Sequence, residues 1–217
     1  ADANRLVERT EGWIAGLQVA ALVLREHPDV PSFLQTLTGE HRYVLDFLAK
    51  EVLERQPEEI QMFLLLTSPL KSFSAGLCDA ITGRDDSYAV LAQLDASNLF
   101  LIAQDQGRHW YRYHALFRDF LYSVLLRKYP EKIDMLHRRA SLWYEQQGMI
   151  AEAIDHALAG IDNGRAAILI ERIARALWLQ GEWKTILNWI ERLPEENIYP
   201  ELGLFHAWAL IANSQLR

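Results

Sequence analysis

Hydrophobic and polar positions alternate with a period of two over one short stretch of the chain and with a helical period over most of the rest. The stretch 98–113 contains an apolar run, a polar turn that ends in Gly107, and a run of alternating large and polar residues. Apolar and aromatic runs on either side of a glycine-containing turn predict a β-hairpin. A lone hairpin is marginally stable, so we expect helices to pack against it.

Helical periodicity surrounds this hairpin. Behind it, apolar residues recur on one helix face over 116–125, and His114 lies at the junction of strand and helix. Ahead of it, helices are predicted at 3–27, at about 40–55, from 57 to about 66, at 74–83 and at 85–97. Three short helices, a hairpin and a further helix follow one another in the order of a winged-helix domain.

Local signals mark where two of the short helices begin and end. Ser74 is a candidate N-cap, and Gly83 supplies the flexible backbone at which a helix commonly stops. The run Asp85–Ser87 is expected to cap the helix that follows, and Gly107 is expected to supply the turn of the hairpin.

The pattern after residue 127 is helical throughout and carries a repeat. Helices are predicted at about 131–147, 150–160, 163–180, 182–193 and 199–215. The segment Trp143–Gly148 recurs loosely as Trp178–Gly181, with its two glycines 33 positions apart. A helix pair of this period cannot bury its apolar face alone, so stacked TPR-like repeats are predicted. Five tryptophans of this part either line a groove or, as we expect for most of them, fill the core between helices. They are Trp143, Trp178, Trp183, Trp189 and Trp208.

Composition narrows the class of protein. Half of the 217 residues are hydrophobic, enough for one large core or two smaller ones. A net charge of -7 argues against a large basic surface for nucleic acid. The single cysteine, Cys78, excludes an internal disulfide, and we interpret it as a small buried residue rather than a nucleophile.

The chain shows no signal peptide and no apolar run long enough to cross a membrane, which predicts a cytoplasmic protein. It begins without Met and ends inside an expected helix. We therefore expect a fragment of a longer protein.

The sequence offers no catalytic constellation. It contains no GxxxxGK[ST] or GxGxxG phosphate-binding segment and no HExxH or paired-cysteine metal spacing. We predict no catalytic residue, no metal site and no enzyme activity for this chain. DNA binding is also disfavoured, because the predicted recognition helix 85–97 has three Asp and no Lys or Arg. The predicted wing offers only Arg108 and Arg112.

His114 has two interpretations. It is a partly buried residue whose ring bonds a neighbouring backbone group, or it is a ligand contact. A histidine at a helix N-terminus lies where backbone N–H groups favour an anion, and its ring N–H can donate to a phosphate. The residue chemistry alone leaves both open.

The segment Tyr113–Phe120, YHALFRDF, resembles the Met-His-Asp motif of NB-ARC and other STAND signalling ATPases. In those proteins the motif ends a winged-helix domain, and its His contacts the β-phosphate of bound ADP. The resemblance therefore implies a cofactor-binding role for His114. Ala115 replaces the motif Asp and Tyr113 its Met, so the switch-locking role of the Asp is not carried over.

Four motifs are similar to those of MalT-like regulators, which are ATP-dependent transcriptional regulators of the LuxR family. They are TEGWIAGL at Thr10–Leu17, EVLERQP at Glu51–Pro57, YRYHALF at Tyr111–Phe117 and HRRASLWY at His137–Tyr144. The resemblance covers most of residues 5–160. It implies a P-loop ATPase domain before this chain, a helix-turn-helix DNA-binding domain after it, and ATP or ADP as the cofactor of the parent protein.

A second cofactor contact is implied near the N-terminus. In related ATPases a Gly-x-Pro segment lies beside the adenine, and Gly12, Trp13 and Ile14 align with it, with Ile14 in place of the Pro. The alternative is that Trp13 and Ile14 are core residues of a helix.

These observations predict a mainly α chain with three parts. Residues 1–38 end a STAND helical domain, 39–127 form a winged helix with one β-hairpin, and 128–217 begin a TPR-like superhelical sensor arm. The resemblance implies a regulatory segment that couples the nucleotide state of the ATPase domain to an inducer or inhibitory protein bound at the arm. DNA is then bound only through the absent C-terminal domain, the isolated chain holds no cofactor, and no membrane is involved. The alternatives are a helical-repeat interaction scaffold without a nucleotide role and a winged-helix DNA-binding module.

Overall fold

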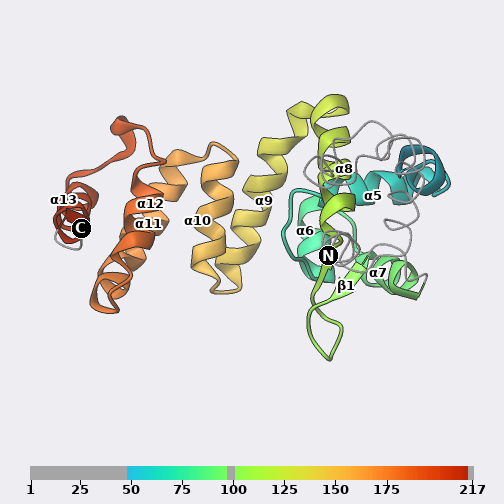
Figure 1. Ribbon diagram of the computed structural model, residues 1–217, viewed down its shortest axis with the longest axis horizontal. Coiled ribbons are helices and arrows are strands. Elements are labelled where there is room, and N and C mark those ends of the chain that lie inside the picture. The colour runs from blue at the N-terminus through green and yellow to red at the C-terminus, as the bar shows by residue number, and fades with distance from the viewer. Residues whose placement is uncertain (1–47, 97–100, 215–217) are drawn as a thin grey trace, which may run out of the picture. The chain divides into compact units, whose positions relative to one another are not determined.

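The computed structural model describes residues 48–96 and 101–214, and the chain divides into two compact units at residue 130 (Figure 1). The mainly α class with one antiparallel hairpin is confirmed. Each unit has its own core. The core of the first unit lies among helices and the hairpin, and that of the second lies between successive helices.

The first unit contains the elements of a winged helix. In chain order they are the π-helix η1 (Leu48–Leu53), α5 (Glu58–Thr67), α6 (Ala75–Thr82), α7 (Ser87–Ala96), β1 (Leu101–Ala103), β2 (Tyr111–Tyr113) and α8 (Ala115–Lys128). α5 packs against α6 and α8, α6 against α7, and α7 against β1. The helix predicted at about 40–55 is a π-helix over its described residues.

The helix α6 begins and ends at the residues that the sequence predicts. The Ser74 side chain accepts a hydrogen bond from the Leu77 N–H at 3.4 Å, and Gly83 ends the helix with a φ of 76°. A side chain with a Cβ is strained at that φ, which explains the glycine. The apolar face of α6 buries Leu77, Cys78 and Ile81.

The start of α7 is stabilised from outside the helix. The Ser87 N–H donates to Asp79 Oδ1 at 3.0 Å, and Asp79 belongs to α6. The Asp86 carboxylate is bound instead by Arg84, with two contacts of 2.7 Å. The predicted helix start at Asp85–Ser87 is confirmed, because the Asp86 carbonyl accepts from the Ala89 and Val90 N–H groups at 3.0 and 3.2 Å. A carboxylate from the preceding helix accepts from the first N–H of α7.

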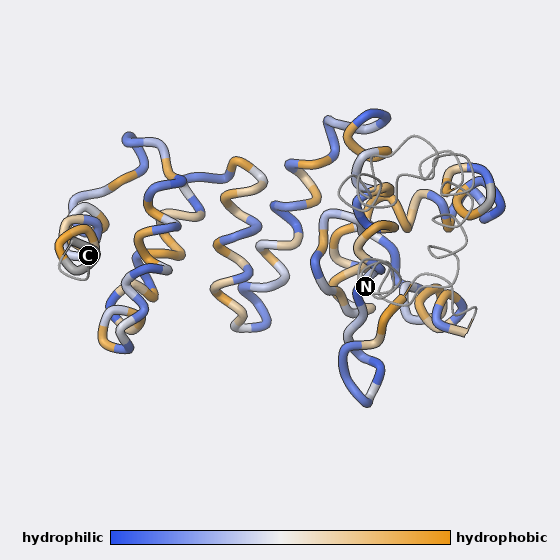
Figure 2. Tube along the Cα trace, in the orientation of Figure 1, coloured by the Kyte–Doolittle hydropathy of each residue, from blue (hydrophilic) through white to orange (hydrophobic). Residues whose placement is uncertain are grey.

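The hairpin pairs Leu101 with Tyr113 and Ala103 with Tyr111. A third short segment joins it, because Phe73 and Tyr111 exchange both backbone N–H···O bonds at 2.8 Å. The left-handed backbone of the turn falls on Arg108, with a φ of 51°, and not on the predicted Gly107. The loop between the strands is hydrophilic, as Figure 2 shows.

The second unit is a series of helices, each packed on the next (Figure 1). A 3₁₀ turn at Pro130–Lys132 precedes α9 (Ile133–Gln146), α10 (Ile150–Ala159), α11 (Asn163–Leu179) and α12 (Trp183–Ile190). A second 3₁₀ turn at Glu195–Asn197 leads into α13 (Pro200–Ser214). The five helices predicted for this part of the chain are confirmed, with ends displaced by a few residues.

The predicted 33-residue repeat has a structural counterpart at two helix ends. Gly148 and Gly181 have φ values of 76° and 82°. At each, the N–H of the next residue bonds a carbonyl five positions back, Met149 to Tyr144 and Glu182 to Leu177, both at 2.9 Å. The glycines therefore close α9 and α11 with the same C-terminal motif.

The tryptophans of this unit differ in burial. Trp189 is buried between helices, as a core interpretation predicts. Trp208 is 47% exposed and contacts Trp178 at a ring distance of 5.8 Å and Phe205 at 5.6 Å. Trp208 is therefore only half-covered, and its ring contacts α11 through Trp178.

Candidate functional site

His114 lies between β2 and α8, at the position that the sequence predicts. It is the N-cap residue of α8, with φ -55° and ψ 139°, and its side chain makes no capping hydrogen bond to that helix. Its carbonyl accepts the first helical bond from the Arg118 N–H at 2.9 Å. The backbone of His114 thus starts the helix while its ring is not used as the cap.

Tyr113 fixes the residue just before His114. Its side chain is 2% exposed, and its hydroxyl lies 2.6 Å from the Thr67 hydroxyl of α5. Its ring packs 4.7 Å from that of Phe73 and meets Phe117 edge-on at 5.8 Å. Burial raises the pKa of Tyr113, so the hydroxyl stays neutral. Tyr113 is therefore a buried anchor at the end of β2.

His114 is held from both sides. Tyr113 precedes it, and Leu116 and Phe117 follow it in the core. The residue is half-buried, and its Nδ1 atom is buried. The first turn of α8 carries no acidic residue, so the positive end of the helix dipole is not neutralised there by its own sequence. This combination of a histidine and a helix N-terminus suits an anion such as a phosphate.

The other predicted cofactor-binding residues, Gly12, Trp13 and Ile14, lie outside the described residues. His114 is therefore the one predicted contact whose surroundings the structure describes.

A cavity of about 570 Å³ opens on the first unit. It lies between the start of α6, the helix α7 and the hairpin loop, with Leu91 and Tyr111 among the residues that line it. Arg108, on the loop, binds Asp95 of α7 at 2.5 Å. One of the two cations predicted for the wing is thus paired within the domain, which weakens any contact with DNA phosphates.

Asp105 sets the shape of the hairpin loop. One of its carboxylate oxygens accepts from the N–H groups of His109 and Trp110, both at 2.9 Å, and the other meets the His109 ring at 3.1 Å. These bonds, that from Trp110 foremost, lower the pKa of Asp105. The loop is therefore held by hydrogen bonds among its own residues.

Cys78 is fully buried, which confirms its interpretation as a core residue. Burial, aided by the charge of Asp79, raises the pKa of its thiol, so the nucleophilic thiolate is disfavoured. Within 48–96 and 101–214, no three His, Cys, Asp or Glu side chains are grouped so that they could hold a metal ion.

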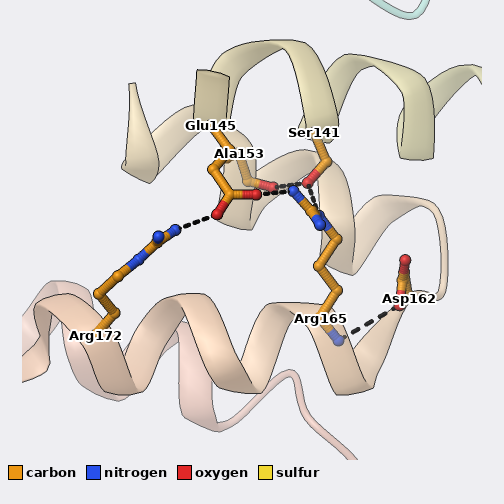
Figure 3. Close-up of polar contacts among 6 residues, drawn as sticks. All are labelled: Ser141, Glu145, Ala153, Asp162, Arg165 and Arg172. Atoms are coloured by element: carbon orange, nitrogen blue, oxygen red, sulfur yellow. Dashed lines mark hydrogen bonds and ion pairs between the residues drawn. The ribbon is translucent and has the colours of Figure 1, made fainter. Parts of the chain in front are cut away.

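A polar cluster that sequence reasoning missed joins α9 to α11 (Figure 3). Glu145 lies between Arg165 and Arg172 and binds both, the contact with Arg172 being 2.5 Å. The Ser141 hydroxyl donates to the Ala153 carbonyl of α10 at 2.7 Å and accepts from Arg165 Nε at 3.1 Å. Three consecutive helices are thus connected through one serine. In the sequence, only the repeat period could have indicated this cluster, because a repeat places α9 beside α11.

The family model described as the MalT winged helix domain matches residues 49–133. The chain is 36% identical over 213 residues to the serine/threonine-protein kinase PknK of Mycobacterium tuberculosis, covering 97% of this chain and 19% of that protein.

MalT regulators are similar over the whole chain. The HTH-type transcriptional regulator MalT of Yersinia pestis is 31% identical over 220 residues, and that of Vibrio cholerae is 28% identical over 219 residues. The chain covers 24% of each of these two proteins. It thus spans about a fifth to a quarter of the length of the curated relatives it matches. The resemblance to MalT-like regulators is confirmed.

Within the part of the chain that the structure describes, no helix has both the length and the hydrophobicity needed to cross a membrane.

Proposed function

Because residues 49–133 match the MalT winged helix domain and MalT regulators are similar to the chain over its full length, we propose that it is a non-catalytic regulatory segment of an ATP-dependent transcriptional regulator. In this proposal the winged helix responds to nucleotide held by an ATPase domain of the same parent protein. The helical arm binds an inducer or an inhibitory protein. The similarity to a kinase fits a regulatory segment shared by proteins with different outputs.

The observation that carries the proposal is the position of His114. The residue starts α8 between buried neighbours, and its ring does not cap the helix. The backbone of His114 is fixed between β2 and α8, so this residue loses little backbone freedom when it binds a phosphate. The adjacent helix N-terminus adds backbone N–H groups and a positive dipole to the same corner.

The energy of this contact is sufficient for a switch. A hydrogen bond to a charged group contributes about 1.5–3 kcal/mol, which corresponds to roughly 10- to 150-fold in affinity. A nucleotide that makes this contact in one arrangement of the domains and not in another shifts their populations by the same factor. An inducer at the helical arm acts in the opposite direction if it prefers the other arrangement.

The test uses the full-length parent protein, purified as wild type, His114→Ala and His109→Ala. The nucleotide that remains bound after purification is measured by chromatography of the denatured protein. We expect ADP in the wild type, at least a tenfold weaker affinity in His114→Ala, and no change in His109→Ala, whose side chain is exposed on the hairpin loop. Equal retention in all three, with unchanged melting temperatures, would refute the role of His114.

One observation favours a second candidate, a helical-repeat interaction scaffold. The helix α13 exposes Leu204, Trp208 and Ile211, which are spaced to lie along one side of a helix. Apolar side chains grouped in this way are typical of protein contacts. Absence of nucleotide from both the wild type and His114→Ala would support this candidate over the first.

A further inference from the structure

Two histidines meet across the first helix pair of the second unit. His137 lies on α9 and His156 on α10, and their Nδ1 atoms are 2.9 Å apart. The ring centroids are 5.0 Å apart with an interplanar angle of 40°. His137 is 8% exposed, and His156 is half-buried. The two nitrogens are therefore at hydrogen-bond distance in a largely dry contact between helices.

The surrounding residues keep the rings together. Tyr144 stacks on His156 at a centroid distance of 5.3 Å and an angle of 24°. At the other end of the contact, Arg138 Nε donates to the Gly160 carbonyl at 3.1 Å. A Cβ on Gly160 would lie 3.0 Å from the His137 Cβ, so the backbones approach closely here. These contacts hold α9 and α10 close together on both sides of the two rings.

A hydrogen bond between two Nδ1 atoms needs a proton on one of them and a lone pair on the other. Two neutral rings satisfy this when they adopt different tautomers, and so does one imidazolium beside one neutral ring. Two imidazolium rings cannot, because both Nδ1 atoms would carry protons at a distance of 2.9 Å. We propose that His137 and His156 form a shared-proton pair that admits one imidazolium and that opens the α9–α10 contact when the second ring is protonated.

The nearby charges do not remove this restriction. On α9, Asp134 is close enough to favour a charged His137. On α10, the carboxylate of Asp155 accepts from Trp189 Nε1 and Arg192, at 3.1 and 2.9 Å, and so is directed to α12. On α11, Arg165 and Arg172 are bound by Glu145. Asp134 can help to stabilise the first positive charge. It does not remove the clash between two Nδ1 protons when both rings are charged.

Burial lowers the pKa of His137, and Asp134 only partly offsets it. The unfolded chain therefore binds a proton at a pH where folded His137 does not. Stability from this source is complete above the ordinary histidine pKa of about 6.5 and is lost as the pH falls below that value. A difference of one proton changes the unfolding equilibrium constant by up to about tenfold per pH unit.

The test is urea unfolding of this chain from pH 7.5 to 5, followed by tryptophan fluorescence, with His137→Gln, His156→Gln and His206→Gln as variants. His206 lies on α13 and serves as the matched control. We expect the unfolding constant of the wild type and of His206→Gln to rise by up to tenfold per pH unit below 6.5. That rise should be reduced or absent in the two pair variants. The same pH dependence in all four proteins would overturn the proposal.

A second measurement needs no variant. Long-range ¹H–¹⁵N spectra of the folded wild-type chain report the tautomer and the protonation of each ring. We expect one of the two rings to carry its proton on Nδ1 at pH 7.5. We also expect the pair to gain a single proton before unfolding begins. Two rings that both carry their proton on Nε2, or that both become fully protonated in the folded chain, would contradict the pair.

Discussion

The hydrogen bond between the Thr67 and Tyr113 hydroxyls predicts which of the two residues contributes more to the free energy of unfolding. Thr67 Oγ1 lies 2.8 Å from the Phe63 carbonyl and 2.6 Å from the Tyr113 hydroxyl. Since a carbonyl can only accept, the Thr67 proton points to Phe63, and Tyr113 donates to Thr67. Both hydroxyls lie in the core beneath the start of α8.

The two deletions differ because they leave different groups behind. Tyr113→Phe removes a donor and leaves the Thr67 proton bonded to Phe63, so it should lower the free energy of unfolding by about 0.5–1.5 kcal/mol. Thr67→Val keeps the side-chain volume but leaves the buried Tyr113 O–H without its acceptor. We expect it to cost about 1–3 kcal/mol, consistently more than Tyr113→Phe.

Urea unfolding followed by circular dichroism measures both variants and the double variant at pH 7. Tyr88→Phe is the matched control, because Tyr88 is 77% exposed and its hydroxyl contributes less than about 0.5 kcal/mol. The double variant should cost less than the sum of the single variants. A larger loss for Tyr113→Phe than for Thr67→Val would refute the assignment of donor and acceptor. Additive losses would refute the hydrogen bond between the two hydroxyls.

Two further predictions concern the second unit. Hydrogen bonds and charge from Arg172 and Arg165 lower the pKa of Glu145, so Glu145→Gln should cost about 0.5–1 kcal/mol at pH 7. That difference from the wild type, measured by thermal melting, should disappear as the pH falls below 4.5, the ordinary pKa of the glutamate, because stability from a lowered pKa is lost on protonation. Gly148→Ala should cost about 1–2 kcal/mol in urea unfolding, because its φ of 76° strains a Cβ even where space is open. Gly164→Ala, inside α11 and also in open space, should instead stabilise by about 0.4–1 kcal/mol.

Local sequence signals predicted the elements well. Ser74 and Gly83 bound α6 as expected, since a capping hydroxyl and a left-handed glycine act within a few residues of themselves. The repeat glycines Gly148 and Gly181 did the same for α9 and α11. His114 could be placed for this reason too, because its position depends on where a strand stops and a helix starts.

The features that the sequence did not predict are contacts between residues from different elements. Such contacts depend on how the elements pack in three dimensions. Nothing local shows that Asp79 accepts from the first N–H of α7, or that Phe73 adds a segment to the hairpin. Arg108 takes the left-handed turn position beside an available glycine, and its ion pair with Asp95 accompanies that choice. The pairing of His137 with His156 likewise depends on how α9 and α10 face each other.

The positions of Tyr113 and His114 determine which helices a nucleotide bound at His114 would affect in the proposed regulator. Tyr113 connects β2 to α5 through Thr67, and His114 begins α8, which itself packs on α5. A phosphate held at His114 would therefore act on α8 and α5 together, because both are fixed to the same backbone junction. The hairpin loop is stabilised separately, by Asp105 and by the Arg108–Asp95 pair. In the proposed regulator the loop can vary in sequence without changing the nucleotide response, whereas substitutions at the Thr67–Tyr113 pair should alter stability and nucleotide retention together.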